Sequence, residues 1–225
     1  MPPESSEKHL PDVAVVTMRS GARPQNATRL LLNVLSELTA VSLVTVVLSE
    51  DSKIHNNYDV TEIAPGSKAD GLFRTMLLFV HNQLRLCRTI SRLDAPVLYF
   101  FGGTAYLLPV IFAKLIGKTV IIQPRGDVPL TLQLEWEKNY PDIVARGLAN
   151  IVRAMEFVSF AVADRIVTYT ESMAEELGLN RFRNKLYPHG TRYIALNDQF
   201  TPQTSFEERD QRVGMVGRLD IEKGI

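Results

Sequence analysis

The stretch that decides the fold is residues 96–127, PVLYFFGGTAYLLPVIFAKLIGKTVIIQPRGD. Two short runs, residues 96–101 and 119–123, are almost free of polar side chains, as strands buried on both faces should be. Residues 104–116 between them have helical character, and Gly117 is placed to end that helix. A strand, a helix and a strand in this order predict parallel pairing through a right-handed crossover.

The same alternation continues on both sides of this unit. Apolar runs predict further strands at residues 13–17, 43–48, 60–64, 165–169 and 184–187. Helical spacing predicts helices at residues 27–38, 71–93 and 142–163, with Asn26 capping the first and Ser172 starting a short capped one, whereas residues 128–140 fit no clear pattern. We therefore expect an α/β fold with a doubly wound, parallel, Rossmann-like sheet, whose ligands lie beyond the carboxyl ends of the strands.

Bulk composition limits the choice of partners and compartment. The 225 residues hold 25 Lys plus Arg and 25 Asp plus Glu, so no overall charge attracts nucleic acid. The single cysteine, Cys87, excludes an internal disulfide. The polar start lacks the apolar stretch of a signal peptide, and no apolar run approaches the ~18 residues of a membrane span. These features predict a cytoplasmic protein.

The last 35 residues differ from the rest. Residues 192–211 are polar and charged, which suits a linker, and residues 213–217 form one more apolar strand followed by a turn. A lone strand cannot build a second core. We expect a first domain at 1–190, a linker at 191–211 and, at 212–225, the start of a truncated second Rossmann-like domain.

Residues 216–224, VGRLDIEKG, closely resemble the opening of the donor-binding domain in family 4 glycosyltransferases. These are two-domain GT-B enzymes that use nucleotide-sugars with retention of configuration. Further pieces resemble family motifs in matching order: ADRIVT at 163–168, TES at 170–172, YPHG at 187–190, FTP at 200–202 and QPRG at 123–126. The resemblance covers residues 90–225 by motif and the first 90 by layout.

This resemblance implies transfer of a sugar from a nucleoside diphosphate to an acceptor hydroxyl, in glycan, polysaccharide or glycolipid synthesis. The donor's diphosphate would meet Arg218 and Lys223, with the helix N-terminus at Gly224 adding N–H groups. A guanidinium and an ammonium stabilise the charge that grows on a departing diphosphate, and the resemblance implies that this happens without a metal or another cofactor. The plainer alternative is two solvated surface cations. Without the remainder of the donor domain, the chain is expected to be inactive.

Candidates for lining the acceptor cleft follow from their positions after strands. Arg125 could hold an anionic acceptor or complete the phosphate site; the alternative is a structural ion pair with Asp127. No Asp-x-Asp is present for a metal–diphosphate clamp, and no catalytic residue is assigned. The complete set of cleft candidates is Gly21, Gly102, Gly103, Arg125, Gly126, Asp127, His189 and Gly190.

The helix expected at 71–93 carries five basic residues and no acidic one. Helical spacing places all five on one narrow face, opposite Met76, Phe79, Val80, Leu86 and Ile90. Such a stripe could dock on an anionic bilayer at the inner face of the membrane, or on a lipid-linked acceptor. The alternative is a core-packed helix with a solvated cationic face. The basic residues are Arg74, His81, Arg85, Arg88 and Arg92.

Two other functions remain open at this point. A sugar-nucleotide epimerase of GT-B fold shares the two-domain layout but transfers nothing to an acceptor. A non-catalytic Rossmann-like binding or scaffold domain would pack residues 213–225 back onto the edge of its own sheet.

Overall fold

The computed structural model describes residues 10–17, 22–48, 52–63, 71–102 and 106–190. Seven parallel strands form one sheet in the order β3-β2-β1-β4-β5-β6-β7. Every pairing between neighbours is parallel, which confirms the predicted doubly wound sheet. The strands are β1 (Val13–Thr17), β2 (Val41–Thr45), β3 (Asp59–Glu62), β4 (Val97–Phe101), β5 (Thr119–Gln123), β6 (Arg165–Val167) and β7 (Leu186–Tyr187).

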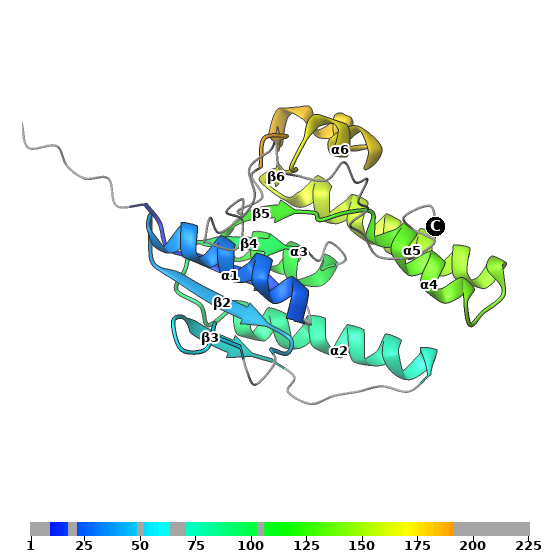
Figure 1. Ribbon diagram of the computed structural model, residues 1–225, viewed down its shortest axis with the longest axis horizontal. Coiled ribbons are helices and arrows are strands. Elements are labelled where there is room, and N and C mark those ends of the chain that lie inside the picture. The colour runs from blue at the N-terminus through cyan, green and yellow to red at the C-terminus, as the bar shows by residue number, and fades with distance from the viewer. Residues whose placement is uncertain (1–9, 18–21, 49–51, 64–70, 103–105, 191–225) are drawn as a thin grey trace, which may run out of the picture.

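Helices cover both faces of the sheet (Figure 1). One buried cluster packs α2, α3 and α5 against side chains such as Val16 and Phe100, and the other packs α1 against Val15 and Leu43. Successive residues of β1 thus serve opposite cores, as the two-residue period of a strand requires. The helices are α1 (Ala22–Ser36), α2 (Leu72–Ile90), α3 (Leu107–Leu115), α4 (Val128–Glu137), α5 (Asp142–Val162), α6 (Glu171–Glu176) and the 3₁₀ helix η1 (Leu179–Lys185).

Three local predictions need correction. Asn26 lies inside α1 rather than at its start, and its Oδ1 accepts a hydrogen bond from Arg29 (2.9 Å). The cap of α6 is Thr170, whose Oγ1 accepts from the Met173 N–H, so Ser172 does not start that helix. The unassigned residues 128–140 contain α4, which Asp127 caps by accepting from the Leu130 N–H (2.8 Å). In α4 and α6 a side chain nearer the preceding strand satisfies the first N–H groups of the helix.

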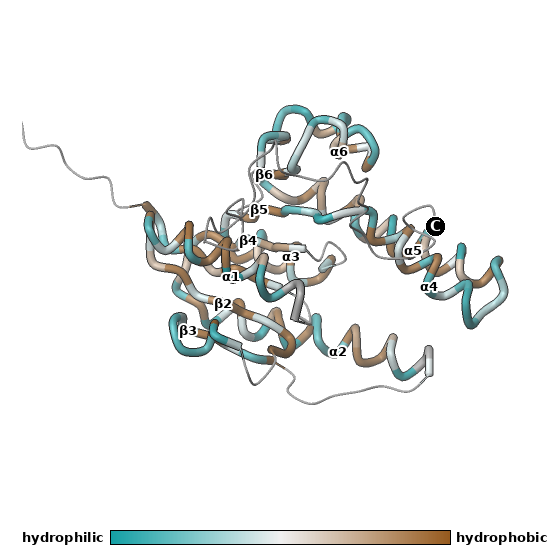
Figure 2. Tube along the Cα trace, viewed as in Figure 1, coloured by the Kyte–Doolittle hydropathy of each residue, from teal (hydrophilic) through white to brown (hydrophobic). Residues whose placement is uncertain are grey.

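The long helices α2 and α5 extend past the carboxyl ends of the strands, and α4 packs along the projecting part of α5 (Figure 1). The hydropathy colouring shows apolar residues on these projecting parts as well as inside the fold (Figure 2). They include Met76, Leu77 and Ile143, which are exposed by 46%, 56% and 82%.

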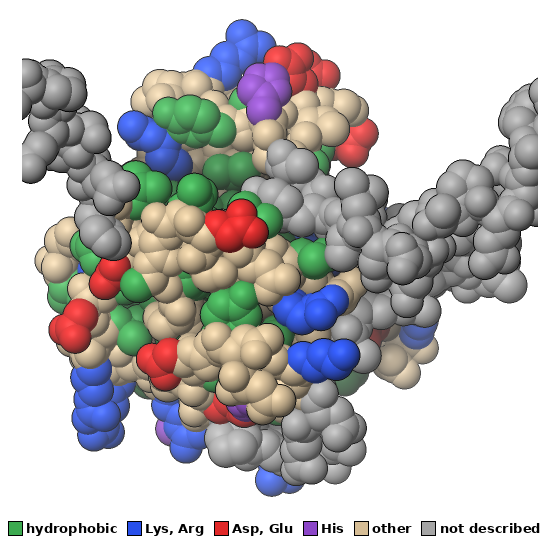
Figure 3. Space-filling view, turned by 60° about the vertical axis from the view of Figure 1, so that its left-hand side comes forward, with side chains coloured by type: hydrophobic (Ala, Val, Ile, Leu, Met, Phe, Trp, Pro, Cys, Tyr) green, Lys and Arg blue, Asp and Glu red, His purple; other side chains and the backbone are tan. Residues whose placement is uncertain are grey.

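Charged side chains are dispersed on the face that Figure 3 presents, where basic and acidic residues stand singly or in small groups. This distribution agrees with equal numbers of the two signs in the sequence. The predicted linker and second domain, residues 191–225, lie outside the described residues, so those boundaries stay predictions.

Candidate functional site at the carboxyl edge of the sheet

The carboxyl edge consists of Gly102, residues 124–127, residues 168–170 and residues 188–190, which directly follow β4, β5, β6 and β7. Gln123 joins the first two of these segments. Its backbone oxygen accepts from the Gly102 N–H (3.0 Å), and its side-chain Oε1 accepts from the Tyr99 hydroxyl (2.6 Å). Because Gln123 is buried and fixed in this way, the loops on either side of it have defined positions.

Gly190 is packed against the ends of β5 and β6. Its N–H donates to the Thr168 carbonyl (2.7 Å). A Cβ at this position would lie 2.8 Å from Val167 Cγ1, 2.9 Å from the Thr168 oxygen and 3.3 Å from Gln123 Nε2. The backbone of the Pro-His-Gly turn therefore approaches the strand ends more closely than any side chain permits.

Gly102 and Arg125, both predicted cleft residues, lie next to each other. Gly102 has φ +80°, in the left-handed region that favours glycine, and a Cβ there would lie 2.8 Å from Arg125 Cδ. The Arg125 guanidinium carbon stands 5.4 Å from the centre of the Phe101 ring, within cation–π range. Stacking on Phe101 and on the glycine backbone holds an exposed cation at the edge of the sheet.

Asp127 has a structural task, because its carboxylate caps α4. The ion pairs formed within the described residues do not include one between Arg125 and Asp127, so the structural alternative for Arg125 is not observed. Gly126 has open space where a Cβ would stand, and His189 is exposed at the rim. Gly21, Gly103, Arg218, Lys223 and Gly224 lie outside the described residues.

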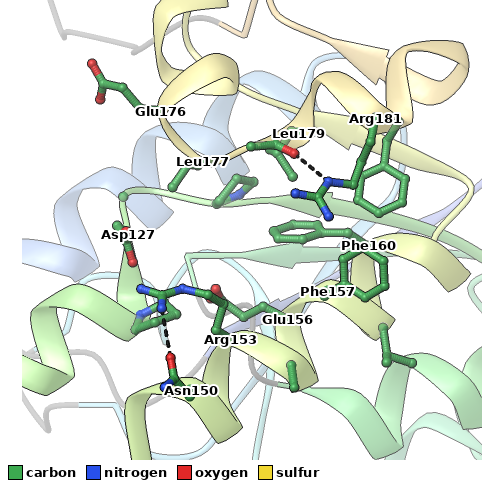
Figure 4. A pocket seen from close by; sticks show the side chains of 17 residues that line it. Asp127, Asn150, Arg153, Glu156, Phe157, Phe160, Glu176, Leu177, Leu179 and Arg181 are labelled. Carbon is green, nitrogen blue, oxygen red and sulfur yellow. Dashed lines mark hydrogen bonds between the residues drawn. The ribbon is translucent and has the colours of Figure 1, made fainter. Parts of the chain in front are cut away.

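A pocket of about 560 Å³ opens beside this edge. Its walls come from the loop after β5, the start of α4, the middle of α5 and the segment from α6 to η1 (Figure 4). Gly126 and Asp127 line it, so the pocket adjoins two of the predicted cleft residues. Arg153 and Arg181 contribute cations, Glu156 and Glu176 carboxyl groups, and Phe157, Phe160 and Phe182 aromatic rings.

Glu156 is the unusual group in this pocket. The residue is 8% exposed, and the pKa of its carboxyl is raised from 4.5 to about 8. Burial is the main cause, the nearby Asp127 carboxylate adds to it, and Arg153 opposes both effects. Arg153 is itself held by a hydrogen bond to Asn150 Oδ1 (3.0 Å), one turn earlier on α5. At neutral pH Glu156 is therefore mostly a protonated acid that can donate a hydrogen bond.

Reasoning from sequence did not identify Glu156, Arg153 or Arg181. A signal for Glu156 was nevertheless present: the buried face of α5 includes Ala145, Ala149, Glu156 and Phe160. These positions follow helical spacing, so an acidic residue among them occupies a core position. Buried acids without a partner are rare and concentrate at functional sites.

The basic stripe of α2 has a divided environment. At its carboxyl-terminal half, Leu86 and Ile90 are fully buried against the sheet, as the core-packing alternative expects. At its amino-terminal half, Met76 and Val80 are exposed by 46% and 47%, and Leu84, just past the middle of the helix, is exposed by 56%. Arg85 donates to the Ile63 carbonyl (3.0 Å), and the other predicted contact residues Arg74, Arg88 and Arg92 are exposed. The projecting half of α2 is thus both apolar and basic at its surface.

Two further properties concern the described ranges. They contain no group of three His, Cys, Asp or Glu side chains arranged to hold a metal ion. None of their helices combines the length and the apolar character needed to cross a membrane.

Comparison with solved structures shows which known fold the chain resembles. The chain resembles Phytolacca americana UGT2, solved with UDP-2fluoro-glucose and pterostilbene, at 14% identity and TM-score 0.51, over 82% of this chain and 55% of that one. It also resembles a UGT transferase from Siraitia grosvenorii in complex with UDP, at 14% identity and TM-score 0.50, over 83% and 52%. A UDP-N-acetylglucosamine 2-epimerase from Rickettsia bellii matches at 13% identity and TM-score 0.50, over 82% and 46%.

These proteins have the GT-B fold, and the chain has the architecture of one of its Rossmann-like domains. The chain spans about half the length of each of them. No family model and no curated protein matches the sequence.

Proposed function

We propose that this chain is the acceptor-side half of a retaining glycosyltransferase of GT-B fold, resembling family 4, that uses a nucleoside-diphosphate sugar. The observation that carries the proposal is the carboxyl edge. Arg125 and Gly190, from family-like motifs, and Gly102, from its position after a strand, pack there around Gln123 in the fold of one GT-B domain. Ligands of an open parallel sheet bind at this edge, and the family-like motifs that contain Arg125 and Gly190 lie there.

The donor side of the proposal rests on the sequence and on the structural neighbours. Two of the neighbours were solved with UDP or a UDP-sugar. Arg218 and Lys223 would stabilise the diphosphate as it leaves, and Gly224 would start the helix that receives it. Arg125 would add a cation from the acceptor side, where an anionic acceptor or the same diphosphate reaches the edge.

The test uses a version of the protein that continues beyond residue 225 into a complete second domain. It is incubated with UDP-, GDP- and ADP-sugars and a panel of glycan and lipid acceptors, and products are read by mass spectrometry. We expect transfer with one donor class, and a loss of at least 100-fold for Arg218→Ala or Lys223→Ala. Arg209→Ala, in the charged run before the last strand, is the matched control. Transfer unaffected by both site variants would refute the donor assignment, and turnover by the 225-residue chain alone would contradict its expected inactivity.

An epimerase is the second candidate, because a UDP-N-acetylglucosamine 2-epimerase is among the structural neighbours. The two candidates separate when the longer protein is incubated with a nucleotide-sugar and no acceptor. Conversion of the donor sugar to its epimer supports the epimerase. An unchanged donor that is consumed once acceptor is added supports the transferase.

We propose in addition that the exposed surface of α2 contacts an anionic bilayer or a lipid-linked acceptor. Exposed Met76, Val80 and Leu84 share with the basic residues a helix that has no acidic side chains, and such a helix combines apolar insertion with attraction to anionic lipid. Arg74 and Arg88 are exposed cations of this helix.

Cosedimentation with phosphatidylglycerol-containing and purely zwitterionic vesicles tests this contact. We expect binding to the anionic vesicles that weakens with salt and falls at least fivefold for the pair Arg74→Glu, Arg88→Glu. Arg165→Glu, at the start of β6, keeps the same kind of charge change away from α2 and serves as control. Equal binding to both kinds of vesicle, or none to either, would contradict the proposal.

A further inference from the structure

The pocket beside the carboxyl edge contains a buried acid without a hydrogen-bond partner. Among the contacts of the described residues, no hydrogen bond reaches the carboxyl of Glu156, although the residue is only 8% exposed. Most buried polar groups in proteins are satisfied by a hydrogen bond. Within the described residues the sealed side-chain atoms without a partner are Thr17 Oγ1, Asn82 Oδ1 and the Tyr106 hydroxyl, so the carboxyl of Glu156 is not sealed but open to the pocket. Glu156 lines the pocket, so a molecule bound there can supply the missing partner.

The charges around the pocket balance. Asp127 at the start of α4 and Glu176 on α6 are acidic, and Arg153 on α5 and Arg181 on η1 are basic. With Glu156 protonated at neutral pH, the residues that line the pocket carry two carboxylates and two guanidinium groups. An anionic or a cationic ligand would upset this balance, and an uncharged ligand would preserve it.

Aromatic rings line the same pocket. Phe157, Phe160 and Phe182 form a cluster, with ring centres 5.7 Å apart for Phe157–Phe182 and 6.5 Å apart for Phe160–Phe182. The Arg181 guanidinium carbon stands 5.3 Å from the Phe157 ring centre, and its Nε donates to the Gly178 carbonyl (3.0 Å). Figure 4 shows these groups around the same cavity as Glu156 and Arg153. Hydrogen-bonding groups and phenyl rings in one pocket suit a ring with hydroxyls and an apolar face.

We propose that this pocket binds an uncharged, hydroxyl-bearing ring of the size of a sugar or a simple glycoside, with one hydroxyl hydrogen-bonded to Glu156 and the apolar face against the phenyl cluster. The volume of about 560 Å³ lies within the range of roughly 300–1,000 Å³ found for small-molecule sites. That this ligand is the acceptor rests on the proposed function; that the pocket binds it does not.

The experiment titrates the 225-residue chain with phenyl β-glucopyranoside, glucosamine and glucose 6-phosphate at pH 6.5, followed by ¹H–¹⁵N NMR. We expect the neutral glycoside to shift amides of residues 150–158 and 176–182, and the charged sugars to bind at least fivefold more weakly. Glu156→Gln keeps a neutral donor and acceptor and should bind within twofold of wild type. Glu156→Ala should bind at least fivefold more weakly, while Glu175→Gln, on the exposed side of α6, should have no effect.

Dependence on pH gives a second readout that a purely structural role would not produce. Wild-type binding should weaken as the pH rises through about 8, because Glu156 then gains a charge beside Asp127, whereas Glu156→Gln should bind equally at pH 6.5 and 9. Thermal melting establishes that each variant is folded. Glycoside binding that is equal in wild type and folded Glu156→Ala, amide shifts elsewhere, or tighter binding of a charged sugar would each overturn the proposal. None of these readouts involves a nucleotide-sugar, so failure here is distinct from failure of the transferase assignment.

Discussion

The two edges of the sheet differ in what connects their segments. At the amino edge, where the strands begin, Lys114, Lys118 and Lys185 bridge neighbouring segments. At the carboxyl edge there are closely packed glycines and a pocket. Lys118 Nζ donates to the carbonyls of Leu93 (2.5 Å) and Ala95 (2.8 Å), before β4. Lys185 Nζ donates to Ala161 (2.6 Å) and Ala163 (2.8 Å), where α5 ends. Cations at the carbonyls that follow a helix satisfy groups the helix cannot satisfy itself.

Asp164 completes the amino edge. It accepts from Lys114 Nζ (2.8 Å) and from the Val120 N–H (2.8 Å), which joins α3 and β5 to the start of β6. Burial disfavours the ionised form, but the hydrogen bonds outweigh it and hold the pKa of Asp164 below its ordinary value. Glu156, on the carboxyl side, has the opposite shift because it has no such partner. One sheet thus stabilises a carboxylate at one edge and destabilises another at the opposite edge, and a buried carboxyl is informative about function chiefly where its charge is not compensated.

Among the stability changes that test this contrast between Asp164 and Glu156, the largest is expected at Glu156. A folded-state pKa of about 8 against an ordinary 4.5 means that the native state holds a proton that the unfolded state loses, so the free energy of unfolding falls as pH rises from 4.5 through 8. Glu156→Gln removes this dependence and should stabilise the chain at pH 9 by an amount on the order of a few kcal/mol. Urea unfolding at pH 5 and 9 measures it. A parallel pH dependence of the two proteins would contradict the raised pKa.

Next in size is the close packing at the carboxyl edge. Gly190→Ala should lower the free energy of unfolding by about 2 kcal/mol, because its Cβ would press on the Thr168 carbonyl and Val167, which belong to the sheet. Gly126→Ala is the matched control, with no atom within 4 Å of its Cβ position, and should change stability by less than about 0.5 kcal/mol. Denaturant unfolding compares the two variants. Equal losses of unfolding free energy would show that the strand ends can shift to accommodate the added Cβ.

At the amino edge, Asp164→Asn should cost about 1–2 kcal/mol at pH 7 through weakened charge-assisted hydrogen bonds, a value reduced because Asp164 and Lys114 are each about one-third exposed. The depressed pKa gives stability that is present above the ordinary value of 3.8 and lost as pH falls through the folded-state pKa. The difference between wild type and variant, followed by unfolding from pH 7 to 2.5, should therefore shrink in acid. A difference constant over that range would argue against an ionic contribution.

The smallest effect is expected at Arg125. Arg125→Ala removes an exposed cation–π contact with Phe101 and should cost less than about 1 kcal/mol. Arg125→Lys retains the charge, and its stability should lie between those of the wild type and Arg125→Ala. Thermal melting checks stability, and the same pair in the transfer assay checks function. A large loss of stability would show that Arg125 has a structural role, as the charged residues at the amino edge have.

The sequence predicted the sheet well because buried parallel strands are written as short apolar runs such as TVIIQ at β5. It left α4 unassigned, since residues such as Val128, Pro129 and Trp136 give that helix little amphipathic contrast, and its definition comes from the Asp127 cap. It placed Gly102, Arg125 and Gly190 at the correct edge, because that depends on strand order alone. Glu156 and Arg181 were missed, because α5 and η1 meet through tertiary packing that local spacing does not encode.

The overhang of α2 and α5 has a mechanical consequence. A helix of 19 residues is about 28 Å long and a five-residue strand about 17 Å, so α2 is roughly 10 Å longer than β4 and part of it stands beyond the strand tips (Figure 1). Any body that docks onto this side of the molecule touches helix ends before it reaches the sheet (Figure 1). The helix ends therefore act as spacers, and the distance kept from the strand tips is fixed by helix length and not by the loops.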